Sequence, residues 1–322
     1  MGQFKNTLKD KFGFDVSTLD AYKGNSLPNI IADLIQESSY LSRFSMEEGI
    51  KGTRTIALLN GDVALQAKVA CTPNPDGSVS ITGKDLIVKP LYMGIEFCNE
   101  TLNGKFTEIL NRIGMKRQDD GSLPADLDVI INAYLGSLLK KKAQRVYVLG
   151  DTASGDAELA LFDGLVKILE AEATAVTSTE TAITASNAYD LAYRMATEFD
   201  SVILDNGETF EVHTGRAEAM KVLKAWNASN PYNTVAIPTG GGTIEFEIPL
   251  TGIKLVTVAE LNGLDKMFGI VPKYCYVGTD SADDMTFDVK YDDYNEKLKS
   301  ESSFRLGGNI ILEQYFTKLV LA

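Results

Sequence analysis

The stretch 124–149 constrains the fold most strongly, because it predicts one unusually long helix. It contains no proline after its first residue. Pro124 suits the first helical turn, and Asp126 and Asp128 lie near the positive end of the helix dipole. Apolar side chains form one broad stripe, made of Leu127, Ile130, Ile131, Tyr134, Leu135, Leu138 and Leu139. We therefore predict a helix of about 25 residues and about 37 Å at about 1.5 Å per residue, which Gly150 ends.

Residues 53–97, ahead of that helix, carry short β-prone runs separated by turn-forming residues. The runs are Thr53–Leu59, Ala64–Ala70 and Leu86–Val88. The separators Asn60-Gly61-Asp62 and Thr72–Gly77 both have strong turn chemistry, which leaves open which of them forms the tip of a hairpin. An isolated two-stranded ribbon is marginal in water. A long β-ribbon is therefore predicted here, resting on a domain of its own or on a neighbouring subunit.

The rest of the chain mixes helical and strand patterns. Residues 1–45 have too little apolar content to fold alone, so they are interpreted as an arm. Helical spacing predicts helices over 187–199 and 215–226. The stretch 234–258 is strand-like, and the tail from Tyr274 onward alternates again. The fold class predicted from these elements is α+β.

The composition excludes several classes of protein. The 322-residue chain carries 31 Lys and Arg against 44 Asp and Glu, which gives a formal net charge of −13. Tight electrostatic binding to nucleic acid needs Lys and Arg that neutralise phosphates, so only weak or local contact with DNA stays open. No apolar run approaches the roughly 20 residues of a membrane span, and the first residues lack the apolar centre of a secretory signal. We expect a soluble chain, made in the cytoplasm, with no membrane partner.

Cysteine and histidine usage argues against most catalytic and metal chemistry. Cys71, Cys98 and Cys275 are far apart and form no CxxC pair, so free buried thiols are expected rather than disulfides or a zinc site. His213 is the single histidine, which makes an HExxH site impossible, and no GxSxG motif is present. We interpret His213 as an ordinary turn or cap residue.

Three further stretches imitate binding motifs but lack the required residues. Gly150–Asp156 has no GK[ST] and is interpreted as a helix-terminating turn, and Gly240–Gly242 is interpreted as a hairpin tip. Met285 stands where an EF-hand needs glycine. A solvated acidic face is therefore predicted for Asp280, Asp283, Asp284, Asp288, Asp292 and Asp293. No catalytic, cofactor-binding or metal-binding residue is assigned, and the chain is predicted not to be an enzyme.

The order of these elements resembles the tailed-bacteriophage major capsid protein of the Hong Kong 97 fold. Helix 124–149 looks like the spine helix of that family, and Leu149-Gly150-Asp151 with Leu161–Leu165 is similar to its Gly-Asp turn. Further motifs that carry the resemblance are Ile248–Val256, Tyr276–Asp280 and Phe304–Gly308. The likeness covers residues from about 45 to 322 and rests on the ordered set of short motifs.

The resemblance implies a division of the chain and a function. The implied parts are an N-terminal arm 1–45, an extended β-ribbon (E-loop) 46–98, a peripheral domain 99–185 with the spine helix, an axial domain 186–275, and a return 276–322 to the peripheral domain. The implied function is that of a structural subunit without cofactors. It would assemble into pentamers and hexamers and enclose double-stranded DNA in an icosahedral virion, after synthesis in the host cytoplasm.

The resemblance also implies partners. Only about 45 residues precede the ribbon, which leaves no room for a fused scaffolding segment, so a separate scaffolding protein is expected. A portal, decoration proteins and non-specific contact with packaged DNA complete the expected set. Some relatives crosslink their subunits through a lysine, but nothing marks Lys68, Lys84 or Lys89 as reactive. Crosslinking is therefore not assigned.

Two alternatives remain open on the sequence alone. An encapsulin-like nanocompartment shell shares this fold and encloses protein cargo. A carboxylate-dependent hydrolase would use two of the 44 acidic residues, and no pair among them is singled out.

Overall fold

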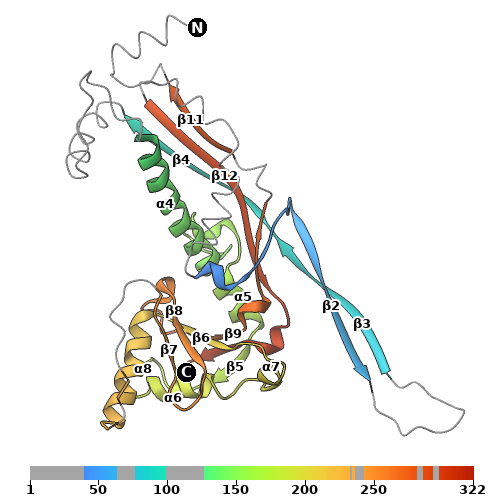
Figure 1. Cartoon of the computed structure of the whole chain (residues 1–322), viewed down its shortest axis with the longest axis vertical. Coiled ribbons are helices and arrows are strands. Elements are labelled where there is room, and N and C mark those ends of the chain that lie inside the picture. The colour runs from blue at the N-terminus through green and yellow to red at the C-terminus, as the bar shows by residue number, and fades with distance from the viewer. Residues whose placement is uncertain are drawn as a thin grey trace, which may run out of the picture.

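The chain has three parts that differ in how they are supported. The computed structural model describes residues 40–63, 77–98, 127–232, 234–235, 243–280, 286–292 and 297–322. A lower body surrounds a six-stranded sheet, an upper part sets one long helix beside a five-stranded sheet, and a two-stranded ribbon projects away from both (Figure 1). The upper and lower sheets are named here by these positions in Figure 1.

The long helix predicted over 124–149 is confirmed as α4, Leu127–Leu149, and residues 124–126 lie outside the described residues. Its 23 residues span about 34 Å at about 1.5 Å per residue. The helix continues through Gly136. Four side chains at helical spacing are buried against the upper sheet and helix α5, namely Leu139, Ala143, Val146 and Tyr147. This stripe holds α4 in place through tertiary packing.

The upper sheet is organised around its longest strand, β12. Its order is β1-β10-β12-β11, and β4 also pairs with β12. The strands are β1 (Ser45–Glu47), β4 (Lys89–Cys98), β10 (Cys275–Thr279), β11 (Thr286–Asp292) and β12 (Lys297–Ile310). Strand β12 runs antiparallel to β4, β10 and β11, whereas β1 and β10 are parallel. The predicted alternation of the tail is confirmed by β11 and β12.

The lower sheet forms the centre of the body, with order β5-β13-β9-β6-β8-β7. Its strands are β5 (Thr174–Thr177), β6 (Glu211–Thr214), β7 (Glu245–Glu247), β8 (Lys254–Thr257), β9 (Met267–Ile270) and β13 (Thr317–Val320). Every residue of β6 and β9 is buried. Burial of consecutive residues means that both faces of these central strands are covered.

Helices cover the lower sheet and complete its core. Their bounds are α5 (Leu165–Glu172), α6 (Ala188–Met195), α7 (Val202–Asp205) and α8 (Arg216–Ser229). Short 3-10 turns occur at η2 (Leu41–Arg43), η3 (Leu159–Leu161), η4 (Ala259–Leu261), η5 (Pro272–Tyr274) and η7 (Glu313–Tyr315). The helices predicted over 187–199 and 215–226 are confirmed by α6 and α8. They bury Met195, Val222 and Leu191 in one cluster with Leu255 of the sheet.

The predicted β-ribbon is confirmed as an antiparallel pair of strands, β2 (Thr53–Val63) and β3 (Gly77–Ile87). One detail of the prediction is wrong, because Asn60-Gly61-Asp62 forms no turn. These residues lie within β2 and pair with Ser80, Val79 and Ser78. Eleven consecutive cross-strand pairs override the local turn preference. The connection from β2 to β3 falls after Val63, so it lies outside the described residues, as does most of the predicted arm.

Candidate functional site

His213 is a core residue, so its interpretation as a turn or cap histidine is wrong. It lies in β6 between two buried neighbours, and its side chain is completely buried. Its Nε2 lies 3.1 Å from a carboxylate oxygen of Glu211 and its Nδ1 lies 3.0 Å from the hydroxyl of Tyr40. Both faces of β6 are covered, so every side chain of the strand is buried. A polar residue at such a position needs hydrogen-bond partners that are also buried.

The stretch Gly150–Asp156 terminates α4, as predicted. The Gly150 amide donates to the Val146 carbonyl, and the Gly164 amide donates to the Gly150 carbonyl. Both the amide and the hydroxyl of Thr152 donate to Asp163. The backbone groups of Gly150 and the amide of Thr152 are therefore occupied by other groups of the chain. The other predicted glycine turn, 240–242, lies outside the described residues.

The solvated acidic face predicted for residues 280–293 is wrong at its first member, Asp280. Asp280 is buried and pairs with the guanidinium of Arg305, whose Nε lies 3.0 Å from Asp280 Oδ2. The other members, or their side chains, lie outside the described residues. Within the described part of the chain no group of His, Cys, Asp and Glu could hold a metal ion.

The thiol of Cys275 is free and buried, as predicted, and burial raises its pKa well above the ordinary value. Cys71 and the side chain of Cys98 lie outside the described residues. None of the described helices is long and apolar enough to cross a membrane.

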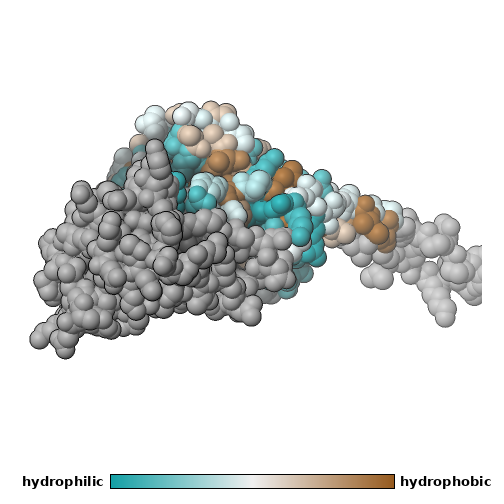
Figure 2. Space-filling view, turned by 90° about the horizontal axis from the view of Figure 1, so that it is seen from above, coloured by the Kyte–Doolittle hydropathy of each residue, from teal (hydrophilic) through white to brown (hydrophobic). Residues whose placement is uncertain are grey.

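The ribbon presents an apolar face without any partner among the described residues of its own chain. Val79 is 65% exposed and Ile81 is 74% exposed. Alternate residues of a strand share a face, so both lie on the same side as Gly83, which pairs with the exposed Ala57 of β2. Figure 2 shows hydrophobic residues on the face seen from above, including some out along the ribbon. Large exposed apolar side chains in such a row are typical of an interaction surface.

The root of the ribbon is held firmly by the upper sheet. Leu86 and Val88 are buried against Ile50. The Asn309 side-chain amide donates to the Asp85 carbonyl over 2.7 Å, and the Val88 amide donates to the Gly52 carbonyl over 2.8 Å. These contacts fix the direction in which the ribbon leaves the body.

Lys84 adds a charged contact at the same root. Its ammonium group pairs with Glu172 and with Glu313, the latter at 2.8 Å. Partial burial alone would lower the pKa of Lys84, but the hydrogen bonds to the two carboxylates raise it. The lysine is therefore a positively charged anchor between the ribbon and the ends of α5 and η7.

A groove of about 320 Å³ lies between α4 and β4. Its walls are mainly apolar and come from both elements, from η3 and from β12. They include Leu91, Ile95, Leu138, Val146, Leu161 and Phe304. Leu161 is 43% exposed at the groove. Lys142 and Glu158 also line it and pair with each other over 2.8 Å, so neither presents an unneutralised charge to an occupant.

Comparison with solved structures identifies the fold. A chain of the satellite phage P4 procapsid, which includes the size determination (Sid) protein, is similar over 99% of both chains, with a TM-score of 0.60 and 11% identity. A chain of the capsid of Myoviridae phage XM1 is similar over 88% of this chain and 92% of its own, with a TM-score of 0.53 and 14% identity. This chain has the fold of phage capsid proteins.

A chain from the capsid of a native GTA particle shares the same capsid fold. It has a TM-score of 0.54 and 11% identity, and the match covers 87% of this chain and 89% of that one. By sequence, no family model and no curated protein matches. The resemblance stated from sequence motifs is thus confirmed at the level of the fold.

Sequence reasoning missed two features of the surface and core. The groove is formed by residues from four elements, so no local sequence pattern predicts it. The pairing of His213 with Glu211 had a usable signal, because residues two apart on a strand lie on one face and the strand is apolar on both sides.

Proposed function

We propose that this chain is the major structural subunit of an icosahedral virus capsid, which assembles into pentamers and hexamers around double-stranded DNA. One observation carries the proposal. A fold shared almost end to end with capsid chains also bears a projecting ribbon whose apolar face is not buried by any of the described residues. Containing a genome is mechanical, so the proposed role needs no catalysis and no cofactor.

The parts of the fold receive their roles from the same proposal. Helix α4 serves as the spine helix, and the β2–β3 ribbon serves as the E-loop. The proposed division is an arm 1–45, the E-loop region 46–98, a peripheral domain 99–185, an axial domain 186–275 and a return 276–322. Packing of Leu306 and Ile310 of β12 in one core cluster with Val146 of α4 supports the return of the chain to the peripheral domain.

The ribbon of one subunit docks in the groove of a second copy of the chain. Both surfaces are apolar, and the ribbon row of Val79 and Ile81 offers side chains of a size that the groove lined by Leu138 and Leu161 can bury. Each strand of the ribbon has 11 residues, or about 36 Å. The groove lies along residues 138–146 of α4, about 14 Å at about 1.5 Å per residue, so it can accommodate only the part of the ribbon around Val79 and Ile81.

Geometry favours a second copy over the ribbon's own chain. In Figure 1 the ribbon points away from the α4 and β4 side of the molecule, and the anchored root prevents it from folding back. The ribbon and the groove are different surfaces on opposite sides of the subunit, so docking of one into the other makes a head-to-tail contact. Such contacts close into rings when the rotation allows it, which is what pentamers and hexamers require.

The partners follow from the role. The chain itself is the main partner. A separate scaffolding protein, a portal and decoration proteins are the further proposed partners, with only non-specific contact to packaged DNA. The net charge of −13 suits a shell that encloses DNA without binding it tightly. The proposed location is the virion, after synthesis in the host cytoplasm.

Assembly of the full-length chain tests the function. We expect mass photometry and negative-stain microscopy to show capsomers or closed shells, either from the chain alone or on co-expression with a candidate scaffolding protein. A strict monomer in both conditions would overturn the proposal. Shells that enclose a specific protein cargo and form without scaffolding would replace it with the encapsulin-like alternative.

Crosslinking tests the docking of the ribbon separately. With Ile81→Cys and Leu161→Cys in one chain, a short bismaleimide should give a ladder of covalent oligomers from assembled protein. Each single substitution is the matched control, because it keeps the native cysteines and supplies only one new thiol. Normal shells without any extra ladder in the double variant would refute the groove as the docking site and leave the capsid role intact.

A further inference from the structure

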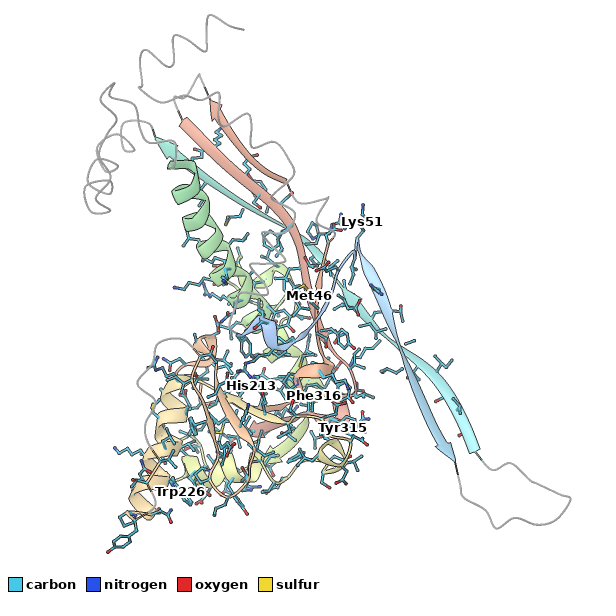
Figure 3. All side chains as sticks on the ribbon, in the orientation of Figure 1. Met46, Lys51, His213, Trp226, Tyr315 and Phe316 are labelled. Atoms are coloured by element: carbon cyan, nitrogen blue, oxygen red, sulfur yellow. The ribbon has the colours of Figure 1, made fainter. Side chains whose placement is uncertain are left out.

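The segment Tyr40–Glu47, here called the strap, is the place where the N-terminal part of the described chain binds both sheets. Its last residues form β1, which pairs with β10 of the upper sheet. Its first residues reach the lower sheet, where Tyr40 meets His213 of β6. Figure 3 shows Met46 above His213 and Phe316, near the level at which the two parts meet. The strap therefore ties the sheets together.

The hydrogen bonds around His213 define which of its nitrogens carries the proton. Hydrogen bonding and the charge of Arg43 hold the Glu211 carboxyl ionised, so it can only accept, and the imidazole Nε2 donates to it over 3.1 Å. The Nδ1 atom of the neutral ring then accepts from the Tyr40 hydroxyl over 3.0 Å. The Tyr40 hydroxyl can donate to Nδ1 only while the ring is neutral.

Arg43 adds a second contact between the strap and the lower sheet. Its guanidinium binds both oxygens of Glu211, at 3.1 and 2.9 Å, and also pairs with Glu245 of β7. The same Glu211 thus holds Arg43 and His213, which places a fixed positive charge close to the imidazole. Among the described residues, the other titratable groups that face the cluster are Glu260 of η4, Tyr147 of α4 and Cys275 of β10.

Protonation of His213 would break this arrangement. A proton on Nδ1 would meet the Tyr40 oxygen, and the hydroxyl would have to turn away. Among the described residues that hydroxyl has no other hydrogen-bond partner. The imidazolium would also carry a positive charge beside Arg43. We propose that Tyr40, Arg43, Glu211 and His213 form an acid-released latch, which holds the strap on the lower sheet at neutral pH and frees it when His213 is protonated.

The direction of the pH effect follows from the state that binds more protons. Complete burial lowers the pKa of His213 below its ordinary value of 6.5, although the hydrogen bond to Glu211 opposes this. An open latch restores the ordinary value, so the open state takes up a proton as the pH falls below about 6.5. Opening should then rise by up to about tenfold per pH unit, until the pH reaches the folded-state pKa.

The other titratable groups of the cluster do not change their protonation in the pH range just below 6.5. Burial alone would raise the pKa of Glu211, but its bonds with His213 and Arg43 bring it below the ordinary 4.5. Its contribution is therefore lost only at lower pH. Burial raises the pKa values of Tyr40, Tyr147 and Cys275. His213 is the single histidine of the chain, so no other imidazole contributes.

Hydrogen exchange read by mass spectrometry tests the latch on the full-length chain, with one assembly state kept for all samples. Between pH 7.5 and 5.5, after correction for intrinsic exchange, we expect peptides covering Tyr40–Glu47 to open progressively faster while peptides of α8 do not. His213→Gln keeps a donor and an acceptor but cannot titrate, so its strap should show no such pH dependence. An unchanged pH dependence in this variant, or equal acceleration in all peptides, would overturn the proposal.

Two further measurements keep the test decisive. Glu245→Gln is the matched control for simple loosening, because it weakens the hold on Arg43 at every pH without removing the titrating group. We expect a higher opening rate with the same pH slope. In the wild-type chain, NMR of isotope-labelled histidine gives one imidazole signal. It should show the Nε2-protonated neutral ring and a pKa below 6.5, and a value at or above 6.5 would refute the latch.

Discussion

The lower body and the ribbon are built from the same chain but stabilised in opposite ways. In the body, helices α6 and α8 cover a sheet whose central strands β6 and β9 are wholly buried. In the ribbon, Val79 and Ile81 are 65% and 74% exposed, and the described residues offer them nothing to pack on. The body thus gains its burial within one chain, whereas the outer ribbon finds no such burial among the described residues.

This difference separates stability from assembly. A substitution in the body should change the free energy of unfolding of the single subunit. A substitution in the outer ribbon should leave that quantity almost unchanged and alter the association of subunits. The root of the ribbon lies between these cases, since Leu86 and Val88 are buried while the strands beyond them are exposed.

Removing the outer ribbon should have the largest effect on assembly. Replacement of 57–83 by a two-residue Asn-Gly turn would join the strands beyond the cross-strand pair Ile56 and Lys84 and would spare the buried root. We expect a folded monomer that forms no shells in negative-stain images. A longer deletion that also removed Leu86 is the contrasting variant, and it should lower the melting temperature as well.

Normal particles from the short deletion would show that the ribbon is dispensable. A loss of folding in the same variant, seen as an absent unfolding transition, would show instead that the ribbon contributes to the core of its own subunit. Either result would remove the contrast between the two regions.

Two alanine substitutions, one in the body and one in the ribbon, should lower the free energy of unfolding by clearly different amounts. Leu255→Ala empties a fully buried position in the body, and we expect it to reduce the free energy of unfolding by about 2–5 kcal/mol. Ile81→Ala removes exposed atoms, so the loss should stay within about 0.5 kcal/mol. Urea unfolding of unassembled subunits measures both. Shell yield should fall for Ile81→Ala, and equal losses of stability in the two variants would contradict the proposed division.

Sequence patterns predicted the elements well where one local rule decided them. The absence of proline and the apolar stripe sufficed for α4, and alternation with flanking turn residues sufficed for the existence of the ribbon. The prediction failed at Asn60-Gly61-Asp62, where pairing with β3 decides the conformation. Turn preference depends on neighbouring residues alone, whereas pairing with an opposite strand depends on residues further along the chain.

The buried polar residues and the groove were harder to predict, because they depend on contacts between distant segments. His213 receives its role from Tyr40, which lies 173 residues away in the chain. Asp280 is buried because Arg305 neutralises it, although the sequence around it reads as an exposed acidic run. The groove needs α4, β4 and Leu161 together. Such combinations follow from the tertiary fold and from no single stretch of sequence.

Removal of the charged anchor at the ribbon root should have a smaller effect on stability than Leu255→Ala, and it tests whether the root belongs to the body or to the ribbon. Lys84→Met keeps the length and the apolar stem of the side chain but removes its pairing with Glu172 and Glu313. The lysine side chain is 20% exposed, so we expect a loss of about 0.5–1 kcal/mol in the free energy of unfolding.

The pH dependence supplies the check on the cause of that loss. The paired Lys84 has a raised pKa, so its contribution is fully present below the ordinary value of 10.5 and is lost as the pH rises through the folded-state pKa. The pKa of Glu313 is lowered, first by its bond with Lys84, so the contribution is also lost as the pH falls below 4.5. The difference between wild type and Lys84→Met in urea unfolding should therefore shrink at both extremes and in high salt. A difference that stayed constant with pH and salt would mean that it does not come from the charge pairing of Lys84 with Glu172 and Glu313.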